Sequence, residues 1–495
     1  MNKTVFKFVL SSLPFLIVFL ANLYRPYDAD LGWHLKYGQY FFDHYQILRD
    51  NIFSTQMPDF HWSNSSWGAD LISFSVFNGF GFLGLTILGA SIVTLTFFFF
   101  AKAAKLSLWD KVLIFPVLFY LEEPINQVSF RGQMMSLLFM GMMYVIFNIY
   151  DVKKSKKSLL LLIPLFLIWA NIHGEFLLGL GLFLGWIILY LFQQILNSNF
   201  KNIKSIFEEG KFLGIIFLLA ALATLINPFG VGVYADILTH IGNPQLKNII
   251  EYLPFDKFST LWWNHLITGA LLLFGVIYYV SGGEYKRKIP EIGLALFLFL
   301  LALEIRRYGW PAYYFALPLL KPLSSMFEPS SKKIYYPLAL FFLAIFLGFV
   351  IKTKLPFNQF SQMSWQIYCK EYVHCSDPSA QFLVNNNFGG NLLTFYDWGG
   401  WLIWNYPEVK PSIDGRMHLW KDANGYSSFE NYYLLEQNLE DIDSSKYDVV
   451  LMSPDKPVYK KLIKLVNQGK WKLLYQDKVS GVFSRNSVKE ENGSL

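Results

Sequence analysis

Long, nearly uncharged blocks of apolar residues recur along the chain and limit the folds that it can adopt. Two examples are residues 6–24 and 261–280. A helix of about 20 apolar residues crosses the ~30 Å hydrocarbon core of a bilayer. Charged residues make up only 16% of the sequence, against roughly 25% in soluble domains. The sequence therefore predicts a multi-pass helical membrane protein and excludes a disordered, collagen-like, coiled-coil or transmembrane-barrel chain.

The apolar blocks predict about eleven transmembrane helices. The first block ends at Arg25 and Pro26 instead of a small-residue cleavage site, so we interpret it as a retained helix and not as a signal peptide. Three blocks are shorter than a full crossing requires, and we interpret them as broken or buried helices beside a cavity. The predicted spans are 6–24, 83–101, 112–121, 133–150, 158–170, 177–195, 212–226, 261–280, 289–303, 309–322 and 334–351.

Basic residues between the spans predict the orientation. Lysine and arginine are retained on the cytoplasmic side, and clusters of them occupy alternate turns, among them 153–157, 201–211 and 286–288. An odd number of spans places the two termini on opposite sides of the membrane. The sequence therefore predicts an integral protein of the plasma (inner) membrane, with a cytoplasmic N-terminus and an extracytoplasmic C-terminal region.

A change in hydropathy near residue 352 predicts two domains. Residues 1–351 form the predicted transmembrane domain, which includes a long first outer loop at 25–82, and residues 352–495 form a soluble extracytoplasmic α/β domain. Cys369 and Cys375 lie where a disulfide can persist, and two buried free thiols are the alternative. In this domain, strands are predicted at 391–395, 401–404, 449–452 and 481–483, and a helix at 457–468.

Two carboxylates lie at the start of the outer loop, close to the predicted end of the first helix. Asp28 and Asp30 are separated by one residue, and His34 follows four residues later. A carboxylate in this position can take a proton from an acceptor hydroxyl, and two carboxylates can bind a divalent ion. The alternative is an ordinary acidic loop, because such acidic pairs also occur by chance.

Polar residues also mark the predicted outer ends of later spans. Arginine can hold a phosphate or pyrophosphate through two parallel hydrogen bonds, and a charge at membrane depth is expected to have a partner. Each of these residues also has a structural explanation, such as an arginine that reaches toward lipid headgroups or a histidine bonded to a neighbouring helix. The candidates are Arg131, Gln133, His173, Glu175, Arg306 and Arg307.

The predicted topology places the aspartates of the first outer loop and the arginines of the later spans on the same face of the membrane. This combination suits the transfer of a group from a membrane-embedded phosphate carrier. Arginine would stabilise the leaving phosphate while an aspartate activates the incoming nucleophile. The chain lacks a P-loop, an H-E-x-x-H helix and a G-x-S-x-G turn. Nucleotide hydrolysis, zinc proteolysis and serine esterase chemistry therefore have no support in the sequence.

Four short segments resemble a group of poorly characterised bacterial membrane proteins with the architecture of the GT-C superfamily of glycosyltransferases. They are 28–35 (DADLGWHL), 169–174 (WANIHG), 396–402 (YDWGGWL) and 413–416 (IDGR). The third segment also resembles, loosely, the aromatic-Asp-aromatic-Gly motif of oligosaccharyltransferase catalytic subunits. The alternative for the third segment is a buried strand and turn, and the alternative for the fourth is a salt-bridged turn.

The resemblance implies a GT-C-like helical fold and a glycosyltransferase embedded in the bilayer. Such an enzyme would move a sugar from a polyprenyl-phosphate or polyprenyl-pyrophosphate donor to an acceptor at the extracytoplasmic face, with inversion at the anomeric carbon. Asp28 or Asp30 would be the general base, and the other would orient it or bind a metal. Residues 67–82 would form an interfacial helix of the outer loop. The residues expected to contact substrate are His34, Arg131, Gln133, His173, Glu175, Arg306 and Arg307.

Several properties stay open at this stage. The cofactor is undetermined, with Mg²⁺ or Mn²⁺ as the candidates, and the acceptor is an unidentified glycan, lipid or protein. Nucleic acid is not an expected partner. The alternatives to a transferase are a GT-C-like scaffold without catalysis, a flippase for lipid-linked saccharides, or a polymerase in cell-envelope assembly.

Overall fold

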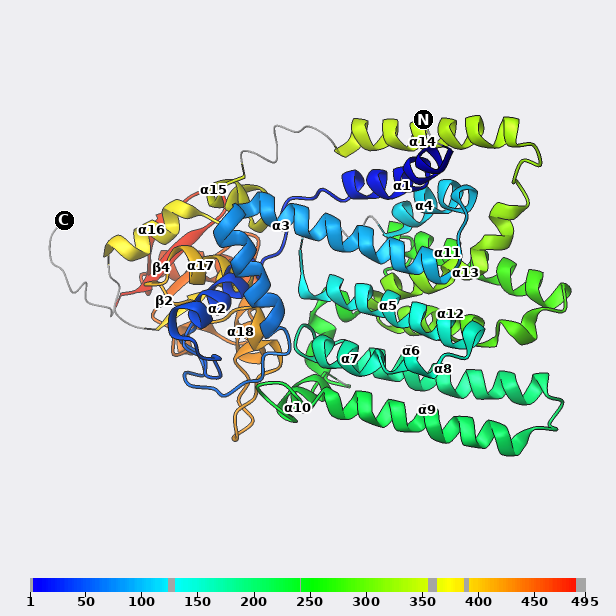
Figure 1. Cartoon of the computed structure of the whole chain (residues 1–495). Helices are drawn as coiled ribbons and strands as arrows, with labels where there is room; N and C mark the ends of the chain where they lie inside the picture. Colours follow the sequence, from blue (N-terminus) through cyan, green and yellow to red (C-terminus); the bar gives the residue numbers. More distant parts are fainter. Residues whose placement is uncertain (1–2, 123–129, 241, 355–362, 387–390, 487–495) are drawn as a thin grey trace. The chain divides into compact units, whose positions relative to one another are not determined.

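The computed structural model describes the chain except for residues 1–2, 123–129, 241, 355–362, 387–390 and 487–495 (Figure 1). The chain divides into two compact units, which we treat separately. The helical unit comprises Met1–Tyr24, Thr86–Val231 and Lys247–Phe357. The α/β unit comprises Arg25–Leu85, Gly232–Leu246 and Asn358–Leu495. The first outer loop of the sequence prediction therefore groups with the C-terminal residues.

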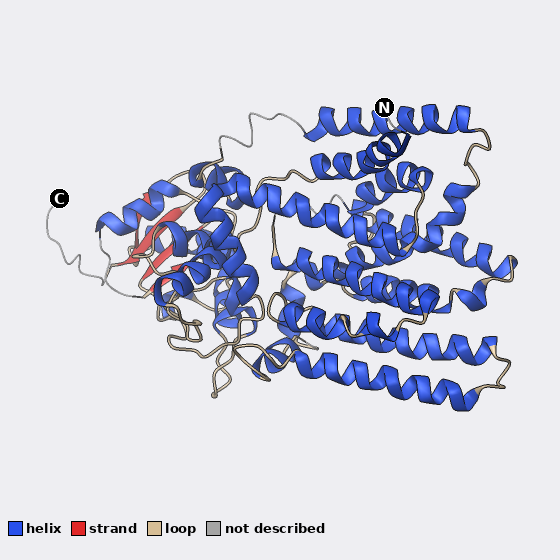
Figure 2. Ribbon diagram, in the orientation of Figure 1, coloured by secondary structure: helices blue, strands red, loops and turns tan. Residues whose placement is uncertain are grey.

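The helical unit consists of long apolar helices joined by short turns (Figure 2). The eleven predicted spans fall on helix, which confirms the helical reading of the apolar blocks, although a turn at residues 160–161 divides the span 158–170 between two helices. Five helices in the described part of the chain are long and apolar enough to cross a membrane, so the number of spans stays a prediction. The helices are α1 (Lys3–Ala21), the later part of α3 (Trp67–Ala103), α4 (Leu108–Glu122), α5 (Gly132–Lys153), α6 (Lys156–Leu159), α7 (Leu162–Ala170), α8 (Phe176–Asn197), α9 (Ile203–Ala223), α11 (Thr260–Ser281), α12 (Ile289–Glu304), α13 (Gly309–Ser325) and α14 (Lys332–Lys354).

The lysine-rich turns lie at one end of the helical unit. These turns join α3 to α4, α5 to α6, α8 to α9, α11 to α12 and α13 to α14, and Figure 1 shows them on the right of the unit. We call this the lysine-rich end. That it faces the cytoplasm stays a prediction from the positive-inside rule.

The α/β unit is built on a four-stranded sheet with the order β1-β2-β4-β3. Strand β1 (Leu392–Thr394) pairs in parallel with β2 (Val449–Met452), and β4 (Gly481–Arg485) pairs antiparallel with both β2 and β3 (Trp471–Gln476). The predicted strands at 391–395, 449–452 and 481–483 are confirmed. The helices of this unit are α2 (Leu31–His44), the start of α3, α10 (Gly232–Leu238), α15 (Trp365–Tyr368), α16 (Asp377–Asn386), α17 (Gly399–Asn405), α18 (Ser428–Glu436) and α19 (Pro457–Asn467).

Two predictions of local structure in this unit are corrected. The run at 401–404 is part of helix α17 and not a strand, because a short apolar run that is buried on all sides carries no period that separates helix from strand. Strand β3 was not predicted at all. The helix predicted at 457–468 is confirmed as α19, and Gly469 after it has the left-handed φ of 74° that often ends a helix.

Two further local features of the α/β unit are a disulfide and a break in a helix. Cys369 and Cys375 form a disulfide, which decides the alternative that the sequence left open. Helix α3 breaks at Gly81, whose φ of 59° and ψ of −152° are not helical. The break separates a first helical stretch, near the predicted segment 67–82, from the apolar span that follows.

Candidate functional site

Two sequence segments that lie far apart in the chain cross with their backbones in contact in the α/β unit. A Cβ atom on Gly32 of α2 would overlap the carbonyl oxygen of Gly400 at the start of α17. A Cβ on Gly400 would in turn overlap the carbonyl oxygen of Ala29. Only glycine at both positions allows this approach. The DADLGWHL and YDWGGWL segments are thus adjacent because of their glycines.

We expect the substitution Gly400→Ala to lower the free energy of unfolding of the α/β unit by about 3 kcal/mol, because backbone atoms on the other side cannot move away as a flexible side chain would. Thermal unfolding of the full chain in detergent measures this. Gly79→Ala is the matched control, since a Cβ there meets no atom within 4 Å and alanine favours helix. Equal melting temperatures for Gly400→Ala and the wild type would contradict the crossing.

The third segment, IDGR, lies against Asp30. A Cβ on Gly415 would overlap the carboxylate of Asp30, so this carboxylate packs directly on the backbone of residue 415. Asp30 is the residue before the first turn of α2, where the partial positive charge of the helix start favours a carboxylate. Its backbone N–H donates to Oδ1 of Asp28 over 3.0 Å, and the hydroxyl of Tyr368 donates to the carbonyl of Asp28. Both predicted catalytic carboxylates therefore sit on a fixed backbone.

His34 is held one turn further along α2 by a buried carboxylate. Its Nδ1 lies 2.5 Å from Oδ1 of Asp70, whose side chain is 1% exposed, and Asn64 donates to Oδ2 of Asp70 over 2.7 Å. The ring of Trp33 stacks on the imidazole at a centroid distance of 3.6 Å. Burial opposes the charged imidazole, but the charge of Asp70 and its hydrogen bond, with smaller contributions from Asp28 and Asp30, raise the pKa of His34 above its usual value. The sequence did not single out Asp70 or Asn64.

Asp414 and Arg416, in the IDGR segment, form a buried ion pair. Arg416 Nε and Nη2 each lie 2.7 Å from one oxygen of Asp414, and both side chains are 0% exposed. Nη2 also donates to Oδ1 of Asn51 over 3.0 Å, and Ser54 donates to Asp414. Burial disfavours the charge of Asp414, but Arg416 lowers the pKa of this carboxyl below its usual value. The salt-bridged turn that the sequence left open is therefore present, and it ties residues of the first outer loop to the C-terminal segment.

The arginines predicted to bind phosphate lie in the helical unit. Arg307 Nε is 3.2 Å from Glu175 and Nη1 is 2.7 Å from Glu251, while Nη1 also donates to the hydroxyl of Tyr252 over 3.2 Å. Two carboxylates thus offset the charge of one guanidinium. Arg306 donates to the carbonyl of Ile250. The sequence missed Glu251 and Tyr252, because they lie in a connecting segment without a motif.

The remaining predicted contacts are also in the helical unit. His173 Nδ1 lies 3.0 Å from the hydroxyl of Ser136 and 3.8 Å from Oε2 of Glu175. Arg131 precedes the first turn of α5, and Gln133 is buried within that turn. His173 and Glu175 are therefore neighbours of the Arg307 ion pairs.

The predicted site residues fall into two groups. Asp28, Asp30 and His34 belong to the α/β unit, whereas the other candidates belong to the helical unit. That both groups face one pocket stays a prediction. No cluster of three or more His, Cys, Asp or Glu side chains placed to hold a metal ion occurs among the residues that the structure describes. Two carboxylates alone do not specify Mg²⁺ or Mn²⁺.

Comparison with known proteins gives a likeness in structure but none in sequence. No family model matches the chain, and no curated protein matches it. The chain is similar in structure to ArnT from Cupriavidus metallidurans bound to undecaprenyl phosphate, with a TM-score of 0.51 and 10% identity over 98% of this chain and 99% of that one. It is also similar to the apo oligosaccharyltransferase of Archaeoglobus fulgidus, with a TM-score of 0.51 and 10% identity over 91% of this chain and 70% of that one.

Proposed function

We propose that this chain, which has the fold of the GT-C membrane glycosyltransferases, transfers a sugar from a polyprenyl-linked phosphate or pyrophosphate to an acceptor at the extracytoplasmic face. The observation that carries the proposal is the position of Asp30. Its carboxylate is at the start of α2 and packs on Gly415, next to the glycine crossing and one turn from the His34–Asp70 pair. Three segments that are distant in the sequence meet around this carboxylate and fix its position. An ordinary surface carboxylate does not need such support, whereas a reacting group does.

Asp30, or Asp28 in its place, would act as the general base. The acceptor hydroxyl loses its proton to the carboxylate as its oxygen attacks the anomeric carbon. The bond from that carbon to the phosphate oxygen breaks, and the lipid phosphate leaves with the electron pair on the opposite face of the sugar. The configuration is therefore inverted, and the carboxylate later returns its proton to water.

His34 would support this chemistry as a cation. Asp70 binds Nδ1 of the imidazole, and Asn64 holds the carboxylate of Asp70 in place. Nε2 is therefore the ring nitrogen that would contact a ligand, and the His34 side chain is 22% exposed. A charged imidazole can bind a phosphate oxygen of the donor. Arg131, Arg306, Arg307, Gln133 and His173 are proposed as further contacts, and Glu175 as the group that orients Arg307.

The lipid carrier is proposed by likeness. The similar ArnT structure holds undecaprenyl phosphate, and a carrier of that class would bring a sugar to the outer face without a cytoplasmic nucleotide. The test is a transfer assay with the purified full chain in nanodiscs, supplied with radiolabelled sugars on polyprenyl phosphate and on polyprenyl pyrophosphate. We expect release of lipid phosphate together with a labelled acceptor product. No turnover with either class, across a panel of sugars and membrane extracts as acceptors, would contradict the proposal.

A GT-C-like scaffold without catalysis is the second candidate. It is favoured by the ion pairs of Arg307, because Glu175 and Glu251 already occupy the guanidinium that a leaving phosphate would need. A scaffold predicts tight binding of the lipid-linked saccharide without its consumption. The same assay separates the two candidates, since bound donor and released lipid phosphate are measured in parallel.

A further inference from the structure

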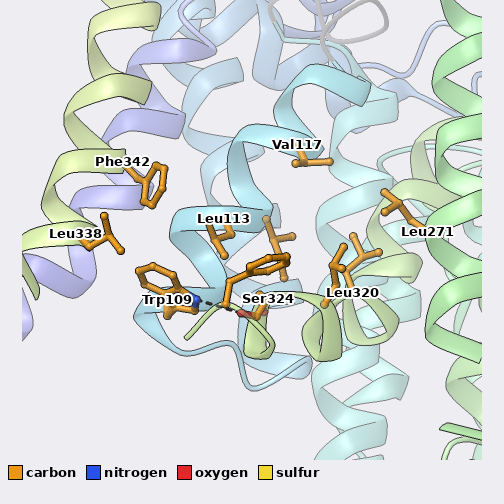
Figure 3. Close-up of a pocket in the computed structure, with 11 residues that line it drawn as sticks. Trp109, Leu113, Val117, Leu271, Leu320, Ser324, Leu338 and Phe342 are labelled. Atoms are coloured by element: carbon orange, nitrogen blue, oxygen red, sulfur yellow. Dashed lines mark hydrogen bonds between the residues drawn. The ribbon is translucent and has the colours of Figure 1, made fainter. Parts of the chain in front are cut away.

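An apolar cavity of about 480 Å³ lies between α4, α11, α13 and α14 of the helical unit. Figure 3 shows Leu338 and Phe342 of α14 on one side, Leu271 and Leu320 on the other, and Trp109 and Ser324 joined by a hydrogen bond. Its volume is within the ~300–1,000 Å³ usual for small-molecule sites. Among the described residues that line it, Ser324 and the indole of Trp109 supply the polar side-chain groups, and the others are apolar. Such a lining suits a hydrocarbon chain and not a polar ligand.

Hydrogen bonds fix the cavity wall at the lysine-rich end. Ser107 and Asp110 cap the start of α4 reciprocally: the N–H of Asp110 donates to Oγ of Ser107 over 3.1 Å, and the N–H of Ser107 donates to Oδ2 of Asp110 over 2.7 Å. Ser324 of α13 donates to the other oxygen of Asp110. Trp109 Nε1 donates to the carbonyl of Ser324 over 3.0 Å, and its backbone N–H donates to the hydroxyl of Tyr335 over 3.0 Å. The starts of α4 and α14 and the end of α13 are therefore tied together.

The cavity continues along the helices. A second apolar hollow of about 600 Å³ follows α4 and α14 and shares Leu113 and Phe342 with the first. From Leu338 to Thr353 the lining extends over 16 residues of α14, or about 22 Å for the 15 steps of 1.5 Å between them. Val117, which lines the first cavity, is 40% exposed. The two hollows together thus form an elongated apolar surface at the periphery of the helical unit.

Basic side chains cluster at the end where the capped helix starts lie. Lys321 is next to Leu320, and Lys332 and Lys333 begin α14, whereas the ammonium group of Lys111 lies over the ring of Phe15, at 5.1 Å from its centre, and away from the cavity. Lys321 donates to the backbone carbonyl of Lys105 over 2.9 Å, and in the part of the chain that the structure describes no carboxylate forms an ion pair with Lys321, Lys332 or Lys333. Trp109 and Tyr335 are at the same level, as is typical where helices enter the headgroup region. This end therefore offers positive charge beside an apolar cavity.

We propose that this cavity binds one anionic phospholipid, with an acyl chain between α4, α13 and α14 and the headgroup phosphate at the lysines. Basic pockets between transmembrane helices are known to select anionic headgroups in this way. A zwitterionic lipid would fill the same hollow but would offer the lysines no net negative charge. The proposal does not depend on the transferase activity, because none of the residues that line this cavity is proposed for transfer.

The test is native mass spectrometry of the full chain, delipidated in detergent and titrated with phosphatidylglycerol or phosphatidylcholine of the same acyl chains. We expect at least a tenfold preference for phosphatidylglycerol and one tightly held copy. The double substitution Lys321→Gln, Lys332→Gln should remove most of the preference. Lys201→Gln, Lys204→Gln at the same end of the unit, but at the start of α9, is the matched control and should retain it.

A cavity-filling variant tests the acyl-chain position independently of charge. Leu113→Trp places bulk between the two hollows and should reduce binding of phosphatidylglycerol at least fivefold, whereas Ile188→Trp, at a position 59% exposed on α8, should not. Circular dichroism confirms that both variants remain helical. Equal affinity for both lipids, retention of the preference without Lys321 and Lys332, or unchanged binding to Leu113→Trp would each overturn the proposal.

Discussion

The substitution Arg416→Ala is expected to lower the free energy of unfolding of the α/β unit by about 3–5 kcal/mol, because it leaves the carboxylate of Asp414 buried without its cation. Both side chains are 0% exposed, and the guanidinium is also packed against the rings of Phe53, Trp62 and Trp420 at 5.0–5.4 Å. The change therefore removes an ion pair and an aromatic contact together. Thermal unfolding of the full chain, with hydrogen exchange of β1 and β2 as the local measurement, checks this result.

Two controls distinguish the effect of breaking the buried Asp414–Arg416 ion pair from the effect of removing a charge in general. Lys470→Gln removes an exposed ion pair with Asp443 and should change the melting temperature little. The double substitution Asp414→Asn, Arg416→Met removes both charges and should be less destabilising than Arg416→Ala alone. An Arg416→Ala protein as stable as Lys470→Gln would contradict the role of the pair.

The same pair predicts a direction for pH dependence. The pKa of Asp414 is lowered in the folded chain, so its contribution is fully present above the unfolded value of about 3.9 and is lost as the pH falls through the lower folded value. The wild type should thus lose stability on acidification more steeply than the Asp414→Asn, Arg416→Met protein.

Asp30→Asn is expected to reduce the rate of sugar transfer by about 10²–10⁴-fold, the usual contribution of a general base. The amide has nearly the shape of the carboxylate, so it can still pack on Gly415, and the loss should appear in kcat with folding intact. Release of lipid phosphate from a radiolabelled donor measures it. Asp43→Asn, an exposed carboxylate on α2, is the matched control.

Further variants locate the base within the acidic segment. Full activity in Asp30→Asn with loss in Asp28→Asn would assign the base to Asp28, whereas full activity in both would exclude the carboxylates as bases. His34→Gln removes the imidazole that Asp70 holds and should raise the KM for the donor more than it lowers kcat, because its proposed contact is to the phosphate. Unchanged KM would contradict that contact.

Much of the helical unit was predictable because its signal is local. An apolar block long enough for a bilayer specifies a helix wherever it lies, and all eleven predicted blocks fall on helix. The predicted strand at 401–404 failed because its residues are buried in helix α17, where apolar character is present on every side. The unassigned strand β3 has a mixed burial pattern, which weakens the alternation that reveals a strand.

The candidate site was predictable only in part. The residue types of Asp28, Asp30 and His34 indicated proton transfer and polar binding, and that reading survives as the proposal. The roles of Asp70, Asn64 and Glu251 could not be derived, since each depends on which segments meet. Glu251 changes the interpretation of Arg307, because a second carboxylate offsets a charge that the sequence left free for phosphate.

The sequence by itself determined that this chain is a membrane protein with long apolar helices, because hydropathy and helix length act residue by residue along the chain. Only the tertiary structure decided that the DADLGWHL, YDWGGWL and IDGR segments come together within one unit. Their contact rests on Gly32, Gly400 and Gly415. A sequence shows where the glycines are, but it does not show which backbone or carboxylate atoms approach them, so this contact could not be predicted.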